Sequence, residues 1–354
     1  MLRKGKFISL CFAMLSLLTA CVHEFPVERH ERVPFLLHLD FSTEMPLHKE
    51  VIYTRSGETQ MNDPDGNHDI RYVVNAYRTD NRRGENRVAD TTFVFTKSDV
   101  ENLDYTAQLY LQEGTYDFRV WADYVDEGST EDKYYVTDDF SEIILADRKN
   151  HSGSNDFRDA FRGYASGTVT NPSYYTGSVA GSINNQATAE MKRPMGKFMF
   201  VSTDREVFLK RVAQMMKERG TLMSAEGQTI DLDDFSVVFR YNPFMPCSFN
   251  MFTDKPADSW SGMSFVSRMR AGDKNEMHLG HDYIFVNGTE TTLAISVEVY
   301  NREGELMSST NPINVPIVRS RLTVVRGEFL TSKATGGITI NPGFDGDDYN
   351  IEIY

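Results

Sequence analysis

The sequence predicts a mainly β protein made of two β-sandwiches and one amphipathic helix. Short stretches of alternating apolar and polar residues recur along most of the 354 residues, for example at 35–41 and 70–77. They are rich in aromatic and β-branched residues and are bounded by Gly, Asn and Asp, as is typical of strands separated by turns. With 40% hydrophobic and 12% aromatic residues, the chain can fill two packed cores.

The first twenty residues have the pattern of a signal peptide. Three positive charges precede an apolar run over 7–18, which is shorter than the roughly twenty apolar residues of a membrane-spanning helix. The following Leu18-Thr19-Ala20-Cys21 resembles the lipobox of bacterial lipoproteins, although a buried cysteine after a chance apolar stretch is the alternative. We therefore expect cleavage after residue 20 and a lipid on Cys21, with palmitate among its acyl chains.

A polar segment over 21–32 is expected to act as a flexible tether that holds the folded part on the cell outer membrane, exposed at the surface. Its acidic residues resemble the surface-export signals of Bacteroidetes lipoproteins. Cys11 leaves with the signal peptide and Cys21 carries lipid, so Cys247 has no partner for an intramolecular disulfide. Loss of the three leading cations changes the formal net charge from −14 to −17, which disfavours nucleic acid as a partner.

An N-terminal sandwich is predicted over residues 33–255. Its clearest local signal is a Leu-x-x-Gly-x-Tyr pattern that ends at Tyr116 and is typical of a tyrosine corner. Alternate residues from Tyr116 to Tyr124 should form one buried face, and Trp121 on the other face could bind a ligand. Residues 151–186 are rich in Gly, Ser, Asn and Tyr and are predicted to be a long surface excursion, with Tyr164, Tyr174 and Tyr175 as exposed contacts.

One helix is predicted over residues 204–219. Thr203 and Glu206 have the spacing of a capping box, apolar residues follow at helical spacing, and Gly220 ends the pattern. The segment 253–258 has the composition of a linker, so a C-terminal sandwich is predicted over 256–354.

Three sequence landmarks together resemble the fimbrillin superfamily of Bacteroidetes type V pili. They are Arg193-Pro194-Met195-Gly196-Lys197-Phe198, Asp282-Tyr283-Ile284-Phe285-Val286, and the segment from Val315 to Thr331. The resemblance implies two tandem transthyretin-like, Greek-key β-sandwich domains. It also implies a lipoprotein precursor that assembles with other fimbrial subunits by β-strand addition, in which a neighbour's terminal strand fills a groove.

If this chain assembles as the fimbrillins do, the strand over 33–41 fills its own groove, and the strand ending at Tyr354 is a candidate to fill the groove of a neighbour. Arg55 is then a candidate site for cleavage by a protease specific for arginine or lysine, although a solvated loop arginine is the alternative. No long donor segment follows Tyr354, which favours an anchor, a tip subunit or a non-polymerising relative.

The sequence nominates no catalytic residue, metal ligand or cofactor. No nucleophile motif, phosphate-binding loop or cysteine cluster occurs, and the spacing of His278 and His281 on a strand would place them on opposite faces. The stretch Asp90-Thr91-Thr92 resembles an O-glycosylation sequon, with Thr91 as the acceptor. The leading hypothesis is therefore a non-enzymatic structural subunit of a fimbria that takes part in cell adhesion. The alternative is a glycan- or protein-binding lipoprotein of a nutrient-uptake system, using Trp121 or Trp260.

Overall fold

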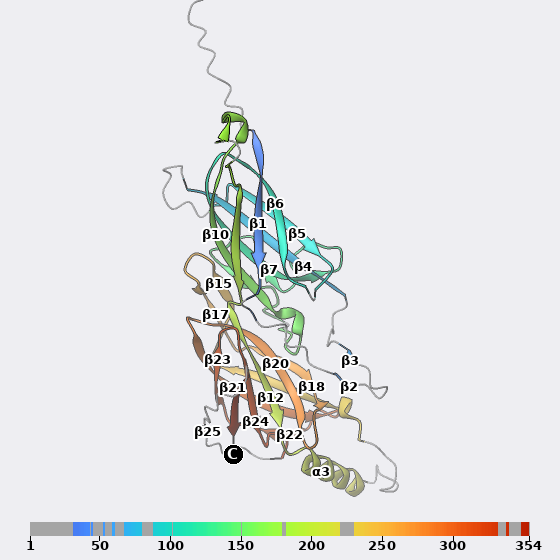
Figure 1. The fold of residues 1–354 in the computed structure, drawn as a ribbon. Helices are drawn as coiled ribbons and strands as arrows, with labels where there is room; N and C mark the ends of the chain where they lie inside the picture. Colours follow the sequence, from blue (N-terminus) through green and yellow to red (C-terminus); the bar gives the residue numbers. More distant parts are fainter. Residues whose placement is uncertain are drawn as a thin grey trace, which may run out of the picture.

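A computed structural model describes residues 31–42, 44, 67–79, 88–100, 102–149, 151–178, 182–219 and 230–331. It also describes the backbone of four short strands at 52–53, 59–60, 338–339 and 348–353. The described chain is mainly β, with a single α-helix at one end (Figure 1), so the predicted fold class is confirmed. The signal peptide, Cys21 and Arg55 lie outside the described residues. No described helix is both long and apolar enough to cross a membrane.

The N-terminal half is built on a seven-stranded sheet. In sheet order its strands are β5 (Thr91–Lys97), β4 (His68–Arg78), β7 (Gly114–Asp126), β10 (Ala160–Val169), β11 (Gln186–Lys192), β1 (Arg32–Asp40) and β6 (Tyr105–Gln112). The short strands β2 (Ile52–Tyr53) and β3 (Thr59–Gln60) pair with each other.

This sheet folds over on itself, so that its two ends face each other across a core. The ring of Phe35 on β1 stacks on Phe118 of β7 with 5.1 Å between centroids, and Tyr105 of β6 stacks on Tyr72 of β4 at 4.8 Å. The turn from β6 to β7 is the predicted tyrosine corner, because the hydroxyl of Tyr116 donates a hydrogen bond to the carbonyl of Gln112 (3.1 Å). The sheet therefore forms one sandwich.

The C-terminal half contains two further sheets. The strands of one are β19 (Arg270–Ala271), β20 (Met277–Phe285), β12 (Met195–Ser202), β24 (Leu322–Gly327), β26 (Asp348–Ile353) and β25 (Ile338–Thr339). The strands of the other are β18 (Ser264–Arg268), β13 (Phe235–Asn242), β21 (Glu290–Asn301) and β22 (Leu306–Ser309), with β23 (Ile313–Val318) also paired to β21. Phe200 of β12 contacts Phe239 of β13 across the core, with ring centroids 5.5 Å apart, so these sheets form a second sandwich.

A small sheet joins the two halves. Its strands are β16 (Lys255–Pro256), β15 (Ser248–Asn250), β9 (Ile143–Leu145) and β8 (Tyr135–Val136). The remaining pair is β14 (Phe244–Pro246) with β17 (Ser259–Ser261). Because β9 comes from the N-terminal half and β15 from the C-terminal half, backbone hydrogen bonds cross between them.

The strand pairing places the change of sandwich earlier than the predicted boundary at residue 256. Strands β12 and β13 precede that boundary, but β12 pairs with β20 and β24 and β13 pairs with β18 and β21. The chain therefore passes into the second sandwich between Lys192 and Met195. The linker-like segment 253–258 is instead the surface turn that contains β16, and a Pro- and Asp-rich turn has the same composition as a linker.

The helix α3 (Arg205–Glu218) lies within one residue of its predicted bounds, but the predicted capping box is wrong. The N-cap residue is Asp204, and the amide of Glu206 donates to the side chain of Asn275 (2.7 Å). The carboxylate of Asp204 accepts hydrogen bonds from Ser202 and Thr331, so it ties the C-terminal segment to the start of the helix. Phe208 and Val212 are its buried residues, whereas Val207 is exposed. Three short 3-10 helices complete the structure: η1 (Asp156–Arg158), η2 (Pro172–Tyr174) and η3 (Leu232–Asp234).

Candidate functional site

The strand β1 lies in a groove between two strands that come from distant parts of the sequence. It pairs antiparallel with β6 along most of its length and parallel with β11 over residues 36–40. One face of β1 points into the core, and its side chains Val33, Phe35, Leu37 and Leu39 are buried. The other face is turned outward, where Leu36 is 38% exposed. Alternate apolar side chains that fill one groove are the geometry expected of an inserted strand.

The floor of the groove is shaped for the side chains of β1. At Gly167 on β10, a Cβ atom would lie 2.6 Å from the ring of Phe35, so only glycine leaves room for that ring. At the end of β1, the ring of Phe41 packs edge-on against Phe161, with centroids 5.0 Å apart. Among the described strands, β11 also pairs with β10, whereas β6 pairs with β1 alone. The strand β1 therefore joins β6 to the rest of the sheet.

The segment after β1 runs into a buried junction between the two sandwiches. The carboxylate of Glu44 accepts hydrogen bonds from Arg193 (3.1 Å) and from the hydroxyl of Ser320 (2.9 Å), and its side chain is only 5% exposed. Arg193 also forms an ion pair with Asp159 at 2.7 Å. The end of β1 is therefore held by residues of the second sandwich.

The landmark residues that carry the family resemblance converge on this junction. Lys197 of β12 donates to Asp156 of η1 (2.5 Å), and both side chains are almost completely buried. Gly196 is required beside it, since a Cβ atom there would lie 2.2 Å from the carbonyl oxygen of Val318. These contacts explain why an arginine, a glycine and a lysine occur together at the entry to β12.

A second set of buried charges surrounds Asp282 of β20. His151 is 2.5 Å from Oδ2 of the carboxylate, and the hydroxyl of Tyr241 donates to the same oxygen. Arg158 lies 3.7 Å from Oδ1. Asp147 in turn accepts from Arg158 at 2.9 Å. Burial alone would raise the pKa of Asp282, but the His151 and Arg158 charges and the hydrogen bonds outweigh it and lower that pKa below its ordinary value.

His151 is the titratable group of this cluster whose charge can change near neutral pH. Burial by itself lowers the pKa of His151, and the charge of Arg158 adds to this. The charge of Asp282 and the hydrogen bonds to Asp147 and Asp282 outweigh both and raise that pKa above 6.5. The folded protein therefore favours the imidazolium form.

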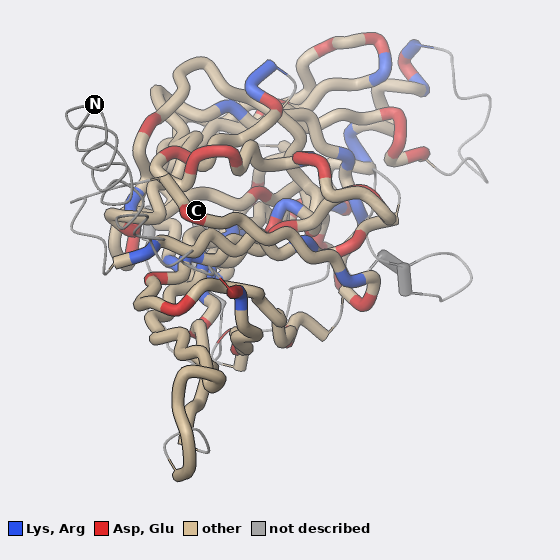
Figure 2. Tube along the Cα trace, turned by 90° about the horizontal axis from the view of Figure 1, so that it is seen from above, with Lys and Arg blue, Asp and Glu red and all other residues tan. Residues whose placement is uncertain are grey.

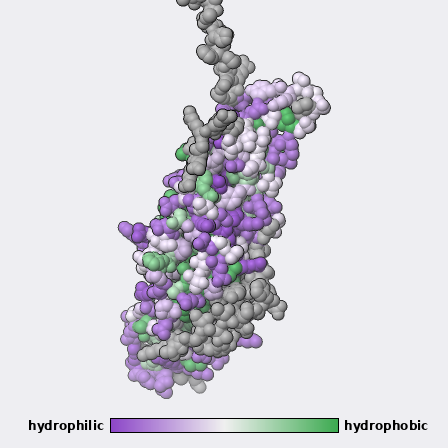
Figure 3. Space-filling view, turned by 90° about the vertical axis from the view of Figure 1, so that its left-hand side faces the viewer, coloured by the Kyte–Doolittle hydropathy of each residue, from purple (hydrophilic) through white to green (hydrophobic). Residues whose placement is uncertain are grey.

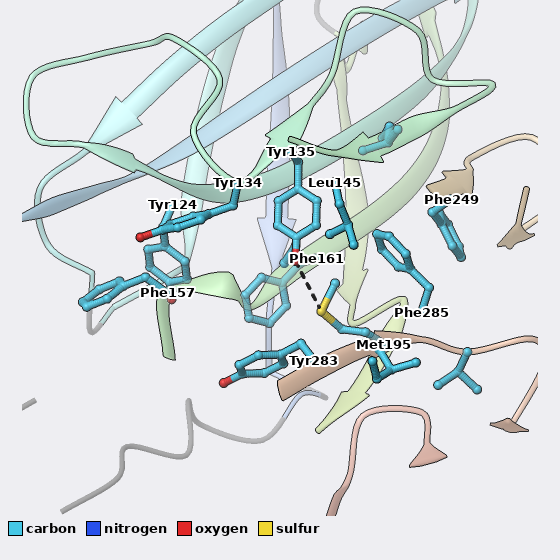
Figure 4. Close-up of a cluster of buried hydrophobic side chains, with 14 of the residues drawn as sticks. Tyr124, Tyr134, Tyr135, Leu145, Phe157, Phe161, Met195, Phe249, Tyr283 and Phe285 are labelled. Atoms are coloured by element: carbon cyan, nitrogen blue, oxygen red, sulfur yellow. Dashed lines mark hydrogen bonds between the residues drawn. The ribbon is translucent and has the colours of Figure 1, made fainter. Parts of the chain in front are cut away.

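Buried apolar side chains from both halves of the chain also meet at the junction (Figure 4). Tyr135 of β8 donates a hydrogen bond to the sulfur of Met195 on β12 (3.8 Å), and its ring packs near Phe285 of β20. Phe249 of β15 lies against the same Phe285 ring at 5.6 Å. The junction is thus a continuous core rather than a hydrated gap between two domains.

Sequence reasoning missed this junction. Asp147, His151, Asp156, Arg158 and Asp159 fall in or beside the segment predicted to be a surface excursion, yet the last four are buried. That segment also contains β10, an inner strand of the first sheet. Charged residues flanked by Gly and Ser are typical of exposed turns, so only the acidic-basic complementarity with Arg193 and Lys197 could have indicated burial.

The two tryptophans proposed as a sugar platform do not form one. Trp121 is 0% exposed and packs edge-on against Tyr135, at 5.4 Å between centroids. Trp260 is 9% exposed and lies beneath the guanidinium of Arg148. A ligand platform needs exposed ring faces, so neither residue serves the glycan-binding alternative.

The other predicted site residues are separated from the groove. Thr91 begins the edge strand β5 and is partly exposed, and Asp90 accepts a hydrogen bond from the amide of Arg78 (2.7 Å). His281 is buried 3.1 Å from Asp156, whereas His278 is partly exposed. Within the described ranges, no group of three or more His, Cys, Asp or Glu side chains could hold a metal ion.

These features define a protein of two β-sandwiches, in the first of which an N-terminal strand lies between β11 and β6. The chain belongs to a family of unknown function, DUF6562, which matches residues 34–354. No curated protein matches the sequence.

Solved structures of low identity resemble the fold. A candidate cell adhesion protein from Bacteroides eggerthii is 15% identical, with a TM-score of 0.43, and the match covers 91% of this chain and 94% of that one. The fimbrial anchor protein Mfa2 from Porphyromonas gingivalis is 10% identical, with a TM-score of 0.36 over 79% of this chain and 82% of that one. A candidate polysaccharide-binding protein from Bacteroides thetaiotaomicron is 10% identical, with a TM-score of 0.38 and coverages of 78% and 79%.

Proposed function

We propose that this chain is a lipid-anchored protein of the bacterial surface that serves as an anchor or accessory subunit of a type V fimbria and takes part in adhesion. In this proposal Cys21 carries the lipid in the outer membrane, and contacts with other fimbrial subunits form by β-strand addition. The observation that carries the proposal is the placement of β1 as an insertable strand between β6 and β11. A subunit that keeps this strand has its own groove filled, as an anchor requires.

The C-terminal strand is the donor in this proposal. Strand β26 pairs parallel with β24 and antiparallel with β25 in the second sandwich. A donor strand must leave these partners before it can fill a neighbour's groove. Arg55 is the proposed cleavage point that would free β1 in a polymerising subunit, and Thr91 is the proposed glycan acceptor.

A strand-exchange experiment tests the proposal. A recognition site for a specific protease is placed between residues 45 and 51, so that cleavage frees the covalent end of β1 without altering the groove. Labelled peptides copying residues 32–41 are then offered to cut and uncut protein, and their uptake is followed by fluorescence anisotropy. We expect the cut protein to take up the peptide and the uncut protein to exclude it.

Two peptide variants provide the matched control. Replacing Phe35 and Leu37 by Asp places charges on the buried face of the peptide and should abolish uptake. Replacing Leu36 and His38 by Asp alters only the outward face and should leave peptide uptake unchanged. Equal uptake of both variants, or none of the native peptide by cut protein, would contradict strand addition. Absence of the protein from sheared fimbriae and from their membrane-bound bases would contradict the fimbrial role.

A further inference from the structure

One long segment of this strongly charged chain has no charged residue. Between Arg162 and Glu190 there is no Asp, Glu, Lys, Arg or His, although charged residues make up 25% of the sequence. Elsewhere along the described chain, acidic and basic residues are interspersed (Figure 2). The uncharged segment comprises most of β10, the turn after it, and the first half of β11.

The turn over residues 170–178 lies at the tip of the first sandwich. Figure 1 shows this tip beside the start of β1, at the end of the molecule opposite α3. Tyr174 and Tyr175 are 57% and 40% exposed there. The same end of the molecule is pale in Figure 3, whereas the body below it is largely purple. We call residues 170–178 the tyrosine tip.

The tyrosine tip has a defined structure and is joined to the strand that carries the N-terminal chain. The side chain of Asn171 is buried and accepts hydrogen bonds from the amide and hydroxyl of Ser173, which caps η2. Asn171 also donates to the carboxylate of Glu31, directly before β1 (3.3 Å). Asn185 holds the start of the tip against β1. Its side chain accepts a hydrogen bond from the amide of Thr170 and donates to the carbonyl of the same residue. It also donates to the carbonyl of Pro34 on β1.

These contacts limit the distance between the tip and the proposed lipid anchor. Ten residue steps separate Cys21 from Glu31, so a fully extended tether reaches at most about 35 Å. Because Glu31 is bound to Asn171 of the tip, the tip stays within about that distance of the residue proposed to carry the lipid.

We propose that the tyrosine tip rests on the lipid surface in which the acyl chains of Cys21 are embedded. Tyrosine places its ring at the level of the headgroups while its hydroxyl stays hydrated, which is why tyrosines gather at membrane interfaces. Charged groups lose hydration at such a surface, and the mature chain, at −17, would be repelled by anionic lipid. The tyrosine tip carries no charge of its own and exposes two tyrosines. The penalties are thereby limited to the carboxylates beside the tip, Glu31 and Glu113, which accept hydrogen bonds from Asn171 and Tyr175. The inference rests on the proposed acylation of Cys21.

The contact can be measured in the lipidated, full-length mature protein reconstituted in phosphatidylcholine vesicles. A Ser173→Cys variant is labelled with an environment-sensitive fluorophore, and the vesicles contain lipids with a quencher at the headgroup or along the acyl chain. Cys247 does not compete for the label, because burial raises the pKa of its thiol to about 12. We expect a blue-shifted emission and strong quenching by headgroup-level quenchers.

The matched control carries the same fluorophore at Val207→Cys, an exposed position on α3 at the opposite end. Quenching at 173 should exceed quenching at 207 several-fold, and Tyr174→Asp with Tyr175→Asp should remove the difference without changing the melting temperature. Equal quenching at both positions, or quenching at 173 that survives the double substitution, overturns the membrane contact.

Two further outcomes separate this inference from the proposed function. Tyr, Ser, Gly and Asn also make up protein- and glycan-recognition loops, so an unquenched tip that instead binds a purified sibling subunit or a glycan overturns the inference alone. If intact mass shows no acyl chains on Cys21, the anchor itself is overturned, and the membrane contact with it.

Discussion

Lys197 and Asp156 form an ion pair whose side chains are 5% and 0% exposed. Removing one member of such a pair leaves a buried charge without compensation. We therefore expect Lys197→Met to lower the free energy of unfolding by about 3–5 kcal/mol, measured by urea denaturation. The control is Lys210→Met on α3, where the lysine is 80% exposed and 3.9 Å from Glu206. A change of more than about 0.5 kcal/mol is not expected there. Similar losses for the two variants would contradict a stabilising role of the junction.

His151 gives the protein a stability that depends on pH. Its pKa is raised in the folded state, so its contribution is fully present below pH 6.5 and is lost as the pH rises through the folded pKa. The pKa values of Asp156 and Asp282 are lowered, so their contributions are present above the unfolded value of 3.8 and lost as the pH falls below it. Unfolding free energies measured between pH 5 and 9 should therefore decline above about pH 6.5.

A His151→Gln variant isolates the histidine from the carboxylates. It should be less stable than the wild type at pH 5.5, and its stability should change less between pH 6.5 and 9. If the unfolding free energy of this variant declines as steeply above pH 6.5 as that of the wild type, another group is responsible for the decline.

At the scale of one element, β1 should stabilise the first sandwich through one face only. Leu37 is 0% exposed and Leu36 is 38% exposed, although the two are adjacent. We expect Leu37→Ala to lower the free energy of unfolding by about 2–5 kcal/mol, and Leu36→Ala to have a much smaller effect. Chemical denaturation of both variants checks this. Comparable losses would mean that the strand is not held by its inward face.

At the scale of the whole molecule, the two sandwiches should unfold together. A continuous cluster of buried apolar side chains runs from β1 and β7 through the junction to β12, β20 and β21. We expect a single calorimetric transition, with equal calorimetric and van't Hoff enthalpies. Two resolved transitions would show that the junction contributes little coupling.

The lipid anchor should be independent of this folded unit. Cys21→Ala should move the protein from the membrane fraction to the soluble fraction, because the acyl chains supply the hydrophobic signal. The melting temperature should stay within error of the wild type, since residue 21 precedes the first described contact at Glu31. Palmitate labelling and fractionation measure the first effect, and a thermal melt measures the second. A variant that still fractionates with membranes would contradict lipid anchoring.

Elements whose signals are local can be predicted from the sequence. The period-two pattern of 35–41 predicts β1 and its buried face, the spacing around Tyr116 predicts the corner, and the apolar spacing near Phe208 predicts α3. In each case a residue's environment depends on neighbours a few positions away.

How distant segments combine became visible only in the folded chain. No local pattern indicates that 253–258 is a turn or that Trp121 is buried. None indicates that His151, Arg158 and Asp282 meet in one core. Strand pairing and charge burial depend on contacts between residues far apart in the sequence, such as Lys197 with Asp156 and His151 with Asp282, and composition and periodicity carry no information about such contacts. Arg193, Lys197 and Asp282 stood out in the sequence as parts of motifs, but their partners in the junction did not, and the role of all of them followed from the fold.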